Sequence, residues 1–434
     1  MKKPLRKVMA AALALTLIMS LLAGCGSKDE GTSGDVVTIK FGIHVANPEE
    51  QENVTYQIVQ AFNEKFEGQY AVEFEASDTE THSKNMKLEA EDGTLPDIFW
   101  IDASEAPEYA SNGYLLDLSG YLEENADIDT ALNGMENAFN NGEMQYGVPY
   151  QCNVQGFFYN KEIFDSANVA YPTDDTTYEE FVQMVKDLKA AGTTPISIGS
   201  KNSGFAMWEF NEFLARYGWE DMYKDMADGN AKYNNDELVK CFEKIDGLRE
   251  AGAFPDTVAT SEYFDAKQAF IDGNAAMFGT GQWDCAAFDE ALGDKVGFWW
   301  GPKFADTDAN QDIAMKVPSA PLVVSAAVAE DEAKMAALTE FLNFYYGEEA
   351  AGISFAGSIF PATNYSDVAA TDTQYAMNSM IEVLGSGWGS PAAAPDQTLN
   401  AAVQEALYDS IFGVIQGNYS PSQALDKMDA AQAN

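Results

Sequence analysis

Strand and helix patterns alternate regularly at the start of the main body, and this order restricts the fold more than any other feature. Apolar residues occupy every second position from residue 37 to 43, which predicts a strand. They then recur at helical spacing between residues 54 and 66. Another alternating stretch at 70 to 74, a helix ending at Gly93 and an apolar run at 97 to 101 complete a βαβαβ order. The sequence therefore predicts an α/β fold with a largely parallel sheet covered by helices.

The same alternation continues along the chain. Residues 178 to 191 predict an amphipathic helix and 195 to 199 a short strand, and later 322 to 325 predict a strand followed by a helix over 331 to 346. No repeat of twenty to fifty residues is visible, which argues against solenoids and propellers. A length of 434 residues corresponds to two or three domain-sized units. We expect two α/β lobes.

Residues 1 to 24 have the pattern of an export signal. This segment contains four basic residues, all before the apolar run, and no acidic residue. The apolar run ends at Leu22, and small residues follow it. The run is too short for a permanent membrane span. Its ending, LAGC, resembles a bacterial lipoprotein signal, in which cleavage leaves Cys25 as a lipid-modified N-terminus on the outer face of the cell membrane. Residues 25 to 35 then form a polar, flexible tether.

The chain carries 69 acidic against 25 basic residues, a formal net charge of −44. Nucleic acid is therefore not expected as a partner, because phosphate binding requires basic patches. A hydrophobic content of 46% is enough for a large core, which argues against disorder driven by charge.

Three cysteines remain after Cys25, namely Cys152, Cys241 and Cys285. An odd number excludes a disulfide framework, and at most one pair can form. Buried free thiols are the favoured interpretation.

Metal and nucleophile chemistry has little support. The only histidines, His44 and His82, have no partner at ligand spacing, and neither a GxxxxGK[ST] loop nor a GxSxG turn occurs. Residues 306 to 312 imitate the start of a calcium loop, but Gln311 stands where Gly is required and Val317 where a bidentate Glu belongs. A solvated acidic loop is favoured, and no cofactor is expected.

Four segments in order carry a family resemblance. They read GTLPDIFW from residue 93, YASNGYLLDL from 109, YGVPY and FFYNKEIF from 146 and 157, and FIDGNAAMFGTGQW from 270. Together they resemble the extracellular solute-binding proteins of carbohydrate ABC importers, family 1, which includes maltodextrin-binding proteins. The resemblance implies a type II periplasmic-binding-protein-like fold, with two lobes joined by a multi-strand hinge and a solute cleft between them. Lobe I is then expected at 36–148 plus 297–357, and lobe II at 149–296 plus 358–434.

The resemblance also implies a function. A monomeric, lipid-anchored receptor of this kind captures a carbohydrate, here expected to be an oligosaccharide, and delivers it to ABC permease subunits, with no bond made or broken. Two alternatives stay open: a receptor for another small solute, such as a polyamine, metal chelate or peptide, and a secreted glycosidase. With 69 carboxylates in the chain, a pair suited to glycoside hydrolysis could exist anywhere, so the presence of carboxylates does not distinguish a glycosidase from a binding protein.

Sugar binding needs aromatic planes for C–H faces, together with fixed donors and acceptors for hydroxyls. Trp283 lies in the Gly-rich stretch GTGQWD, and the resemblance implies a stacking aromatic there. Its neighbours Gln282 and Asp284 are also expected to contact the ligand. Trp100 and Asp102 follow the DIFW strand at its carboxyl end, where open α/β sheets bind ligands.

Further candidates lie near other strand ends and in Gly-rich loops. His44 ends the first strand, and Tyr150 and Asn153 follow the first expected crossing between lobes. Trp208 and Trp388 stand in glycine-rich surroundings that match the rough position of stacking aromatics in maltodextrin binders. Cys152, Trp299 and Trp300 are expected to pack in the interior. The identity, length and linkage of the sugar stay open.

Overall fold

The computed structural model describes residues 36–201, 206–365 and 369–433, and the compact unit spans Val37–Asn434. The export signal, Cys25 and the tether therefore lie outside the described residues. Within the described ranges, no helix has the length and apolar character needed to cross a membrane.

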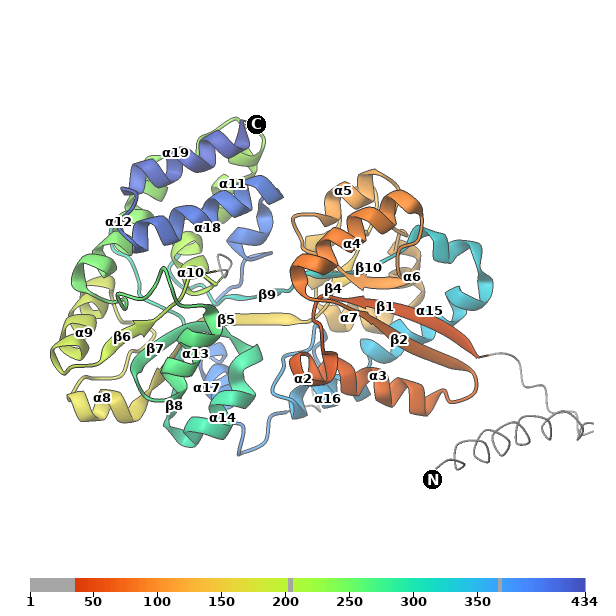
Figure 1. Cartoon of the computed structure of the whole chain (residues 1–434), viewed down its shortest axis with the longest axis horizontal. Helices are drawn as coiled ribbons and strands as arrows, with labels where there is room; N and C mark the ends of the chain where they lie inside the picture. Colours follow the sequence, from red (N-terminus) through yellow and green to blue (C-terminus); the bar gives the residue numbers. More distant parts are fainter. Residues whose placement is uncertain (1–35, 202–205, 366–368, 434) are drawn as a thin grey trace, which may run out of the picture. The chain divides into compact units, whose positions relative to one another are not determined.

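The first sheet contains the N-terminal βαβαβ order. Its strand order is β2-β1-β3-β10-β4, with β1 (Val37–Ile43) parallel to both β2 (Tyr70–Ala76) and β3 (Ile98–Trp100) (Figure 1). Helices α3 (Asn53–Lys65) and α4 (Thr79–Asp92) connect these strands. Gly93 ends α4 in the left-handed region, at φ 69°, which glycine adopts without steric cost. The predicted alternation is confirmed.

The expectation of a largely parallel sheet is correct for β1 to β3 only. Strand β10 (Pro321–Val324) runs antiparallel to β3 and to β4 (Val148–Pro149), with Leu322 opposite Trp100. The chain enters β10 from β9 (Lys316–Pro318) through two residues, without a crossover helix. Strand β4 leads into β5 (Cys152–Asn160), and β9, which runs antiparallel to β5, leads into β10, so the chain returns past β4 in the opposite direction.

The second sheet has the order β6-β7-β5-β8, and β9 also pairs with β5. Strand β6 (Thr194–Ser197) is parallel to β7 (Ala275–Gly281), whereas β5 (Cys152–Asn160) is antiparallel to β7, β8 and β9. This pairing corrects one expected boundary. Strand β8 (Val296–Trp299), expected in lobe I from residue 297, belongs to the second sheet because it is hydrogen-bonded to β5. The chain returns to the first sheet only at β10.

Helix α9 (Tyr178–Ala190) begins with a capping box formed by Thr177 and Glu180, and α15 (Glu332–Tyr345) occupies the segment predicted as a helix. The remaining helices are α2 (Pro48–Gln51), α5 (Ala106–Ser111), α6 (Ser119–Glu124), α7 (Ala126–Leu132), α8 (Lys161–Ala167), α10 (Glu209–Arg216), α11 (Trp219–Ala227), α12 (Asp236–Ala251), α13 (Tyr263–Ile271), α14 (Cys285–Leu292), α16 (Glu348–Ala356), α17 (Tyr375–Leu384), α18 (Ala401–Ile415) and α19 (Pro421–Gln432). Short 3-10 turns are η1 (Met135–Phe139), η2 (Gln282–Asp284), η3 (Gly293–Lys295), η4 (Ala326–Glu330) and η5 (Pro395–Thr398).

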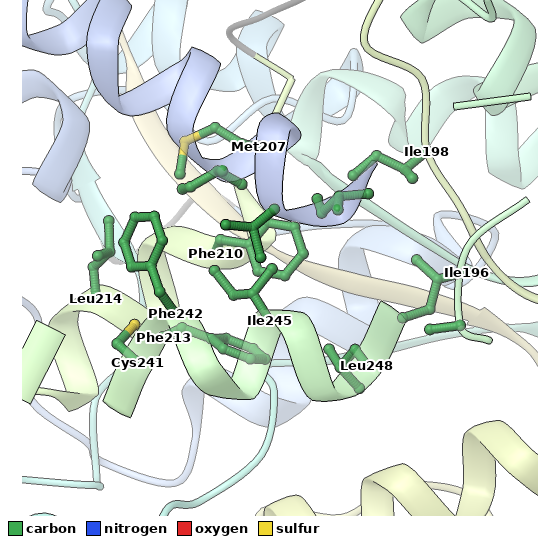
Figure 2. Packing of buried hydrophobic residues seen from close by; sticks show 14 of the residues in the cluster. Ile196, Ile198, Met207, Phe210, Phe213, Leu214, Cys241, Phe242, Ile245 and Leu248 are labelled. Carbon is green, nitrogen blue, oxygen red and sulfur yellow. The ribbon is translucent and has the colours of Figure 1, made fainter. Parts of the chain in front are cut away.

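The interior of the second sheet's half is built around α10 and α12. Figure 2 shows Phe210, Phe213 and Leu214 of α10 beside Phe242 and Ile245 of α12, all fully buried. Every residue of α10 is buried, its three charged residues included. Removal of this apolar area from water is the main stabilising contribution to the fold.

The described cysteines Cys152, Cys241 and Cys285 are free and buried, and burial raises the pKa of the Cys152 thiol to about 12. Trp299 and Trp300 are buried as predicted. All five side chains therefore serve packing.

Three segments connect the two sheets. One lies between β4 and β5, a second between β9 and β10, and the third follows α16. They are hydrogen-bonded to one another: the Tyr150 amide donates to the Ala320 carbonyl at 3.1 Å, the Ser319 amide to Gln151 at 2.9 Å, and the Cys152 amide to Phe360 at 3.2 Å. We refer to these as the connecting segments.

Candidate functional site

Two adjoining cavities share Ser104 and lie against elements of both sheets. The first, of about 410 Å³, is lined by α4, by Trp100 and Asp102 at the end of β3, and by Ala401 and Gln404 of α18. The second, of about 560 Å³, is lined by the segment entering α5, by η1, by α11 and by residues 391 to 400. Trp100 and Asp102 thus line a cavity at the carboxyl end of β3, where ligands bind open α/β sheets.

The ring of Trp100 stacks on His44, with ring centroids 4.0 Å apart and an interplanar angle of 21°. Its backbone carbonyl lies 2.7 Å from Nε2 of His82. Burial, and to a smaller extent His82, lower the pKa of His44 to about 3, so the imidazole is neutral at physiological pH. One face of the Trp100 indole therefore packs on the neutral imidazole of His44, which holds the indole at the cavity wall.

Tyr150 lies beneath this pair. Its ring meets His44 edge-on, and its hydroxyl donates to Glu52 at 3.1 Å and contacts Thr55. Burial raises the pKa of Glu52 to about 7, although the bond from Tyr150 opposes the shift. Tyr150 itself is only 3% exposed. In this geometry Tyr150 supports Glu52 and His44 and offers no surface to a ligand.

Asp102 is half-buried, and its Oδ1 accepts a bond of 2.9 Å from the Ser104 amide. Its charge acts on Asp396, the buried carboxyl in η5. Burial raises the pKa of Asp396 to about 6; Tyr408, whose hydroxyl donates to its Oδ2 at 3.1 Å, and Asn211 lower it, and Asp102 raises it. Asp102 therefore brings an acceptor for hydroxyl or amine groups to the cavity, whereas Asp396 is buried, lines neither cavity and has both oxygens hydrogen-bonded to protein groups.

Trp283 and Trp208 form an aromatic group with Tyr263. The indole rings meet edge to face at 4.9 Å, and Trp283 Nε1 donates to the Tyr263 hydroxyl at 3.0 Å. Trp208 also meets Tyr263 edge-on at 5.2 Å. Both tryptophans are partly exposed, and neither lines the two cavities described above.

Gln282 and Asp284, which flank Trp283, are fully buried. Asp284 accepts hydrogen bonds from Tyr263, Thr280 and Lys267, and Gln282 donates to backbone carbonyls of the connecting segments. Both side chains were expected to contact ligand. Their bonds instead place them in the support of the Trp283 turn.

Asn153 is buried within β5 opposite Val317, and its Oδ1 lies 3.5 Å from Nε2 of Gln151. Its side chain therefore belongs to the connecting region and lines neither cavity.

Trp388 lies beneath two cations. The Lys303 ammonium is 4.9 Å and the Arg216 guanidinium 5.5 Å from the ring centroid, distances at which cation–π attraction operates. Trp388 thus lies apart from the His44–Trp100 stack, and its ring has protein partners.

The acidic loop 306 to 312 is held by lysines. Lys244 pairs with Asp306 at 2.9 Å and Lys303 with Asp312 at 2.8 Å. Among the described residues, no group of three or more His, Cys, Asp or Glu side chains converges as metal ligands would.

Sequence reasoning missed Glu52 and Asp396. Glu52 follows the first strand closely, so the rule that ligands gather at carboxyl strand ends was a usable signal. Asp396 lies in a Pro- and Ala-rich loop far along the chain, and nothing in its neighbourhood indicated that it would lie within electrostatic range of Asp102.

Comparison with known proteins agrees with this architecture. Residues 57–378 match the family described as bacterial extracellular solute-binding protein. The chain is 23% identical over 278 residues to the multiple sugar-binding protein of Streptococcus mutans, covering 62% of this chain and 63% of that protein. It is 27% identical over 184 residues to an uncharacterized lipoprotein in the oleD 5′ region of Streptomyces antibioticus, covering 42% of this chain and 39% of that one. The matches thus span less than two thirds of the length of these two relatives.

A solved structure of a chitin oligosaccharide binding protein superposes with a TM-score of 0.77 at 25% identity, covering 92% of this chain and 98% of that one. The predicted solute-binding-protein fold is confirmed. Because the family match covers most of the chain, the protein belongs to the bacterial extracellular solute-binding protein family.

Proposed function

We propose that this chain captures a sugar or oligosaccharide outside the cell membrane and delivers it to the permease of an ABC importer. The observation that carries the proposal is the cavity wall formed by Trp100, an indole stacked on neutral His44, and by Asp102 beside it. An aromatic plane beside fixed acceptors is the combination that pyranose rings and their hydroxyls require. The sugar-binding relative and the chitin-oligosaccharide-binding neighbour support the carbohydrate class.

We further propose that the ligand lies between two lobes, one built on each sheet. The cavity beside Trp100 is lined by α4 and β3 from the first sheet's half and by α18 from the second. A ligand that contacts both lobes stabilises the form in which they approach each other, because only that form provides both sets of contacts. The protein is expected to act as a monomer and to perform no bond chemistry.

Substitution of Trp100 with alanine is expected to weaken binding of the cognate oligosaccharide at least tenfold, or about 1.4 kcal/mol, the contribution of one stacked aromatic ring. Trp283→Ala is expected to act in the same direction if the ligand extends to the second aromatic group. Calorimetry on purified protein, with the ligand first identified from melting shifts across neutral oligosaccharides, polyamines and peptides, measures the effect.

Trp388→Phe serves as the matched control, because this ring has Lys303 and Arg216 over it and lines neither cavity. The affinity of the Trp388→Phe variant for the oligosaccharide should stay within about twofold of that of the parent protein. If Trp100→Ala binds as tightly as the parent, the assigned wall is wrong. Turnover of the oligosaccharide to new reducing ends would favour the glycosidase alternative.

We propose that Cys25 is lipid-modified and anchors the exported protein to the outer face of the membrane. The uncharacterized lipoprotein relative supports this assignment. Cys25→Ala is expected to abolish incorporation of a labelled fatty acid. Labelling retained in that variant would contradict the assignment, and Cys152→Ala, which removes a buried thiol, provides the control.

A further inference from the structure

The side chain of Gln282 joins the turn that carries Trp283 to two of the connecting segments. Its Nε2 donates to the carbonyl of Cys152, at the start of β5, and lies 3.5 Å from the carbonyl of Phe360, after α16. The Cys152 amide in turn donates to the same Phe360 carbonyl at 3.2 Å. One amide group therefore ties together two segments that pass between the sheets, and Gln282 has no exposed surface.

The chemistry of this position requires a donor. Both neighbouring groups are carbonyl oxygens, which accept hydrogen bonds, so only the NH₂ side of the amide can face them. The Oε1 atom of Gln282 is buried and has no hydrogen-bond partner among the described residues. A methionine has nearly the same length and no donor, and an asparagine keeps the donor on a shorter side chain.

The opposite end of the same turn is also anchored. Asp284 accepts a bond of 2.8 Å from Thr280 and one of 3.0 Å from Lys267. Between the two anchors, the Trp283 indole donates to the Tyr263 hydroxyl. The turn Gln282–Asp284 is therefore anchored at both ends and follows β7, which is paired with β5, and the Gln282 bonds extend this attachment to the segment after α16.

We propose that Gln282 is a positioning residue that couples the Trp283 turn to the connecting segments and thereby sets the resting angle between the two lobes. In the part of the chain that the structure describes, three segments join the lobes, so the geometry at these segments determines their relative orientation. The Gln282 amide restrains two of the three. The inference rests on the proposed function only in assuming that the angle matters for capture of ligand.

The test uses the mature chain without ligand. Cysteines introduced at Leu88 of α4 and Phe264 of α13, which are 62% and 64% exposed, carry spin labels, whereas the native thiols of the described part are buried. For this measurement Cys25 is replaced by alanine. Pulsed electron spin resonance then gives the distance distribution between the lobes. Gln282→Met is expected to shift or broaden that distribution, and Gln282→Asn to act in the same direction.

Gln145→Met is the matched control. Gln145 is also buried, and its Nε2 donates to carbonyls of Glu136 and Gly147, all close in sequence within the first sheet's half. Both methionine variants should lower the melting temperature to a similar extent, but only the change at Gln282 should alter the distance distribution. The proposal is overturned if Gln282→Met and Gln282→Asn both keep the parent distribution. Since no sugar is present, failure of the carbohydrate assignment would leave this result unaffected.

Discussion

Replacement of Glu209 with glutamine is expected to stabilise the protein by several kcal/mol at pH 8 and to have little effect at pH 5. Glu209 lies at the start of α10 with no exposed surface, and neither carboxylate oxygen has a hydrogen-bond partner among the described residues. A Cβ atom added to Gly279 of β7 would lie 2.2 Å from the carboxyl carbon of Glu209, so β7 packs directly against this carboxyl group. Burial raises its pKa to about 8.

The sign of the effect follows from proton linkage. Between the ordinary glutamate pKa of 4.5 and the folded-state value of about 8, the folded protein keeps the proton that the unfolded chain releases. Each pH unit in this window therefore lowers the free energy of unfolding by about 1.4 kcal/mol per such carboxyl. The penalty is absent below the window and complete above it. Glutamine stays neutral throughout and removes the dependence.

Urea unfolding at pH 5, 6.5 and 8 measures this difference. Glu243→Gln is the control, because Glu243 is exposed on α12 and its replacement should leave the profile parallel to that of the parent. Glu52, Glu212 and Asp396 also have raised pKa values and add to the slope in both proteins. A Glu209→Gln profile as steep as that of the parent would refute the assignment of a buried, protonated carboxyl.

Replacement of Arg216 with methionine is expected to destabilise the fold by about 3 to 5 kcal/mol at about pH 9, where Glu212 is ionised and the change removes one member of a buried ion pair. Arg216 is fully buried. Its guanidinium donates to the carbonyls of Gly301 at 2.7 Å, Pro302 at 2.8 Å and Ile313 at 3.1 Å, and lies 3.7 Å from the Glu212 carboxylate. Methionine fills similar space but leaves three carbonyls without their donor.

A double variant separates the charge from the packing. Burial raises the pKa of Glu212 to about 8 although Arg216 opposes the shift, so Glu212 without Arg216 is an uncompensated buried acid. Glu212→Gln in the Arg216→Met background should therefore recover part of the loss, giving a double-variant effect smaller than the sum of the two single effects. Chemical unfolding at about pH 9, above the folded-state pKa of Glu212, gives all four free energies, because the charge coupling is expressed only where Glu212 is ionised in the parent protein. Strict additivity would show that the two side chains act independently.

Local patterns predicted the secondary structure well, because the period of apolar residues reports which face of an element is buried. The βαβαβ segment, α9, α15 and the terminus of α4 at Gly93 follow in this way. Trp100 and Asp102 line a cavity at the position that the same local logic indicates, since a strand end is recognisable in sequence and its carboxyl edge is where a parallel sheet binds ligands; their contact with a ligand stays a prediction.

The residues next to Trp283 have a burial that local sequence patterns did not predict. Gln282 and Asp284 have side chains of the kind that hydrogen-bond to sugar hydroxyls, yet both are buried against protein groups. The partners of Gln282 lie 130 and 78 residues away along the chain, so no neighbouring residue indicates them. The antiparallel direction of β10 likewise depends on a chain return from the other sheet.

The sequence by itself determined the alternating elements and the family resemblance, and it predicts an export signal and a set of aromatic residues for sugar contact. The tertiary structure alone decided which polar side chains line a cavity and which are buried. The reason is physical: hydrophobic periodicity is local, but the burial and the pKa of a side chain such as Glu209 depend on segments that only the fold brings together.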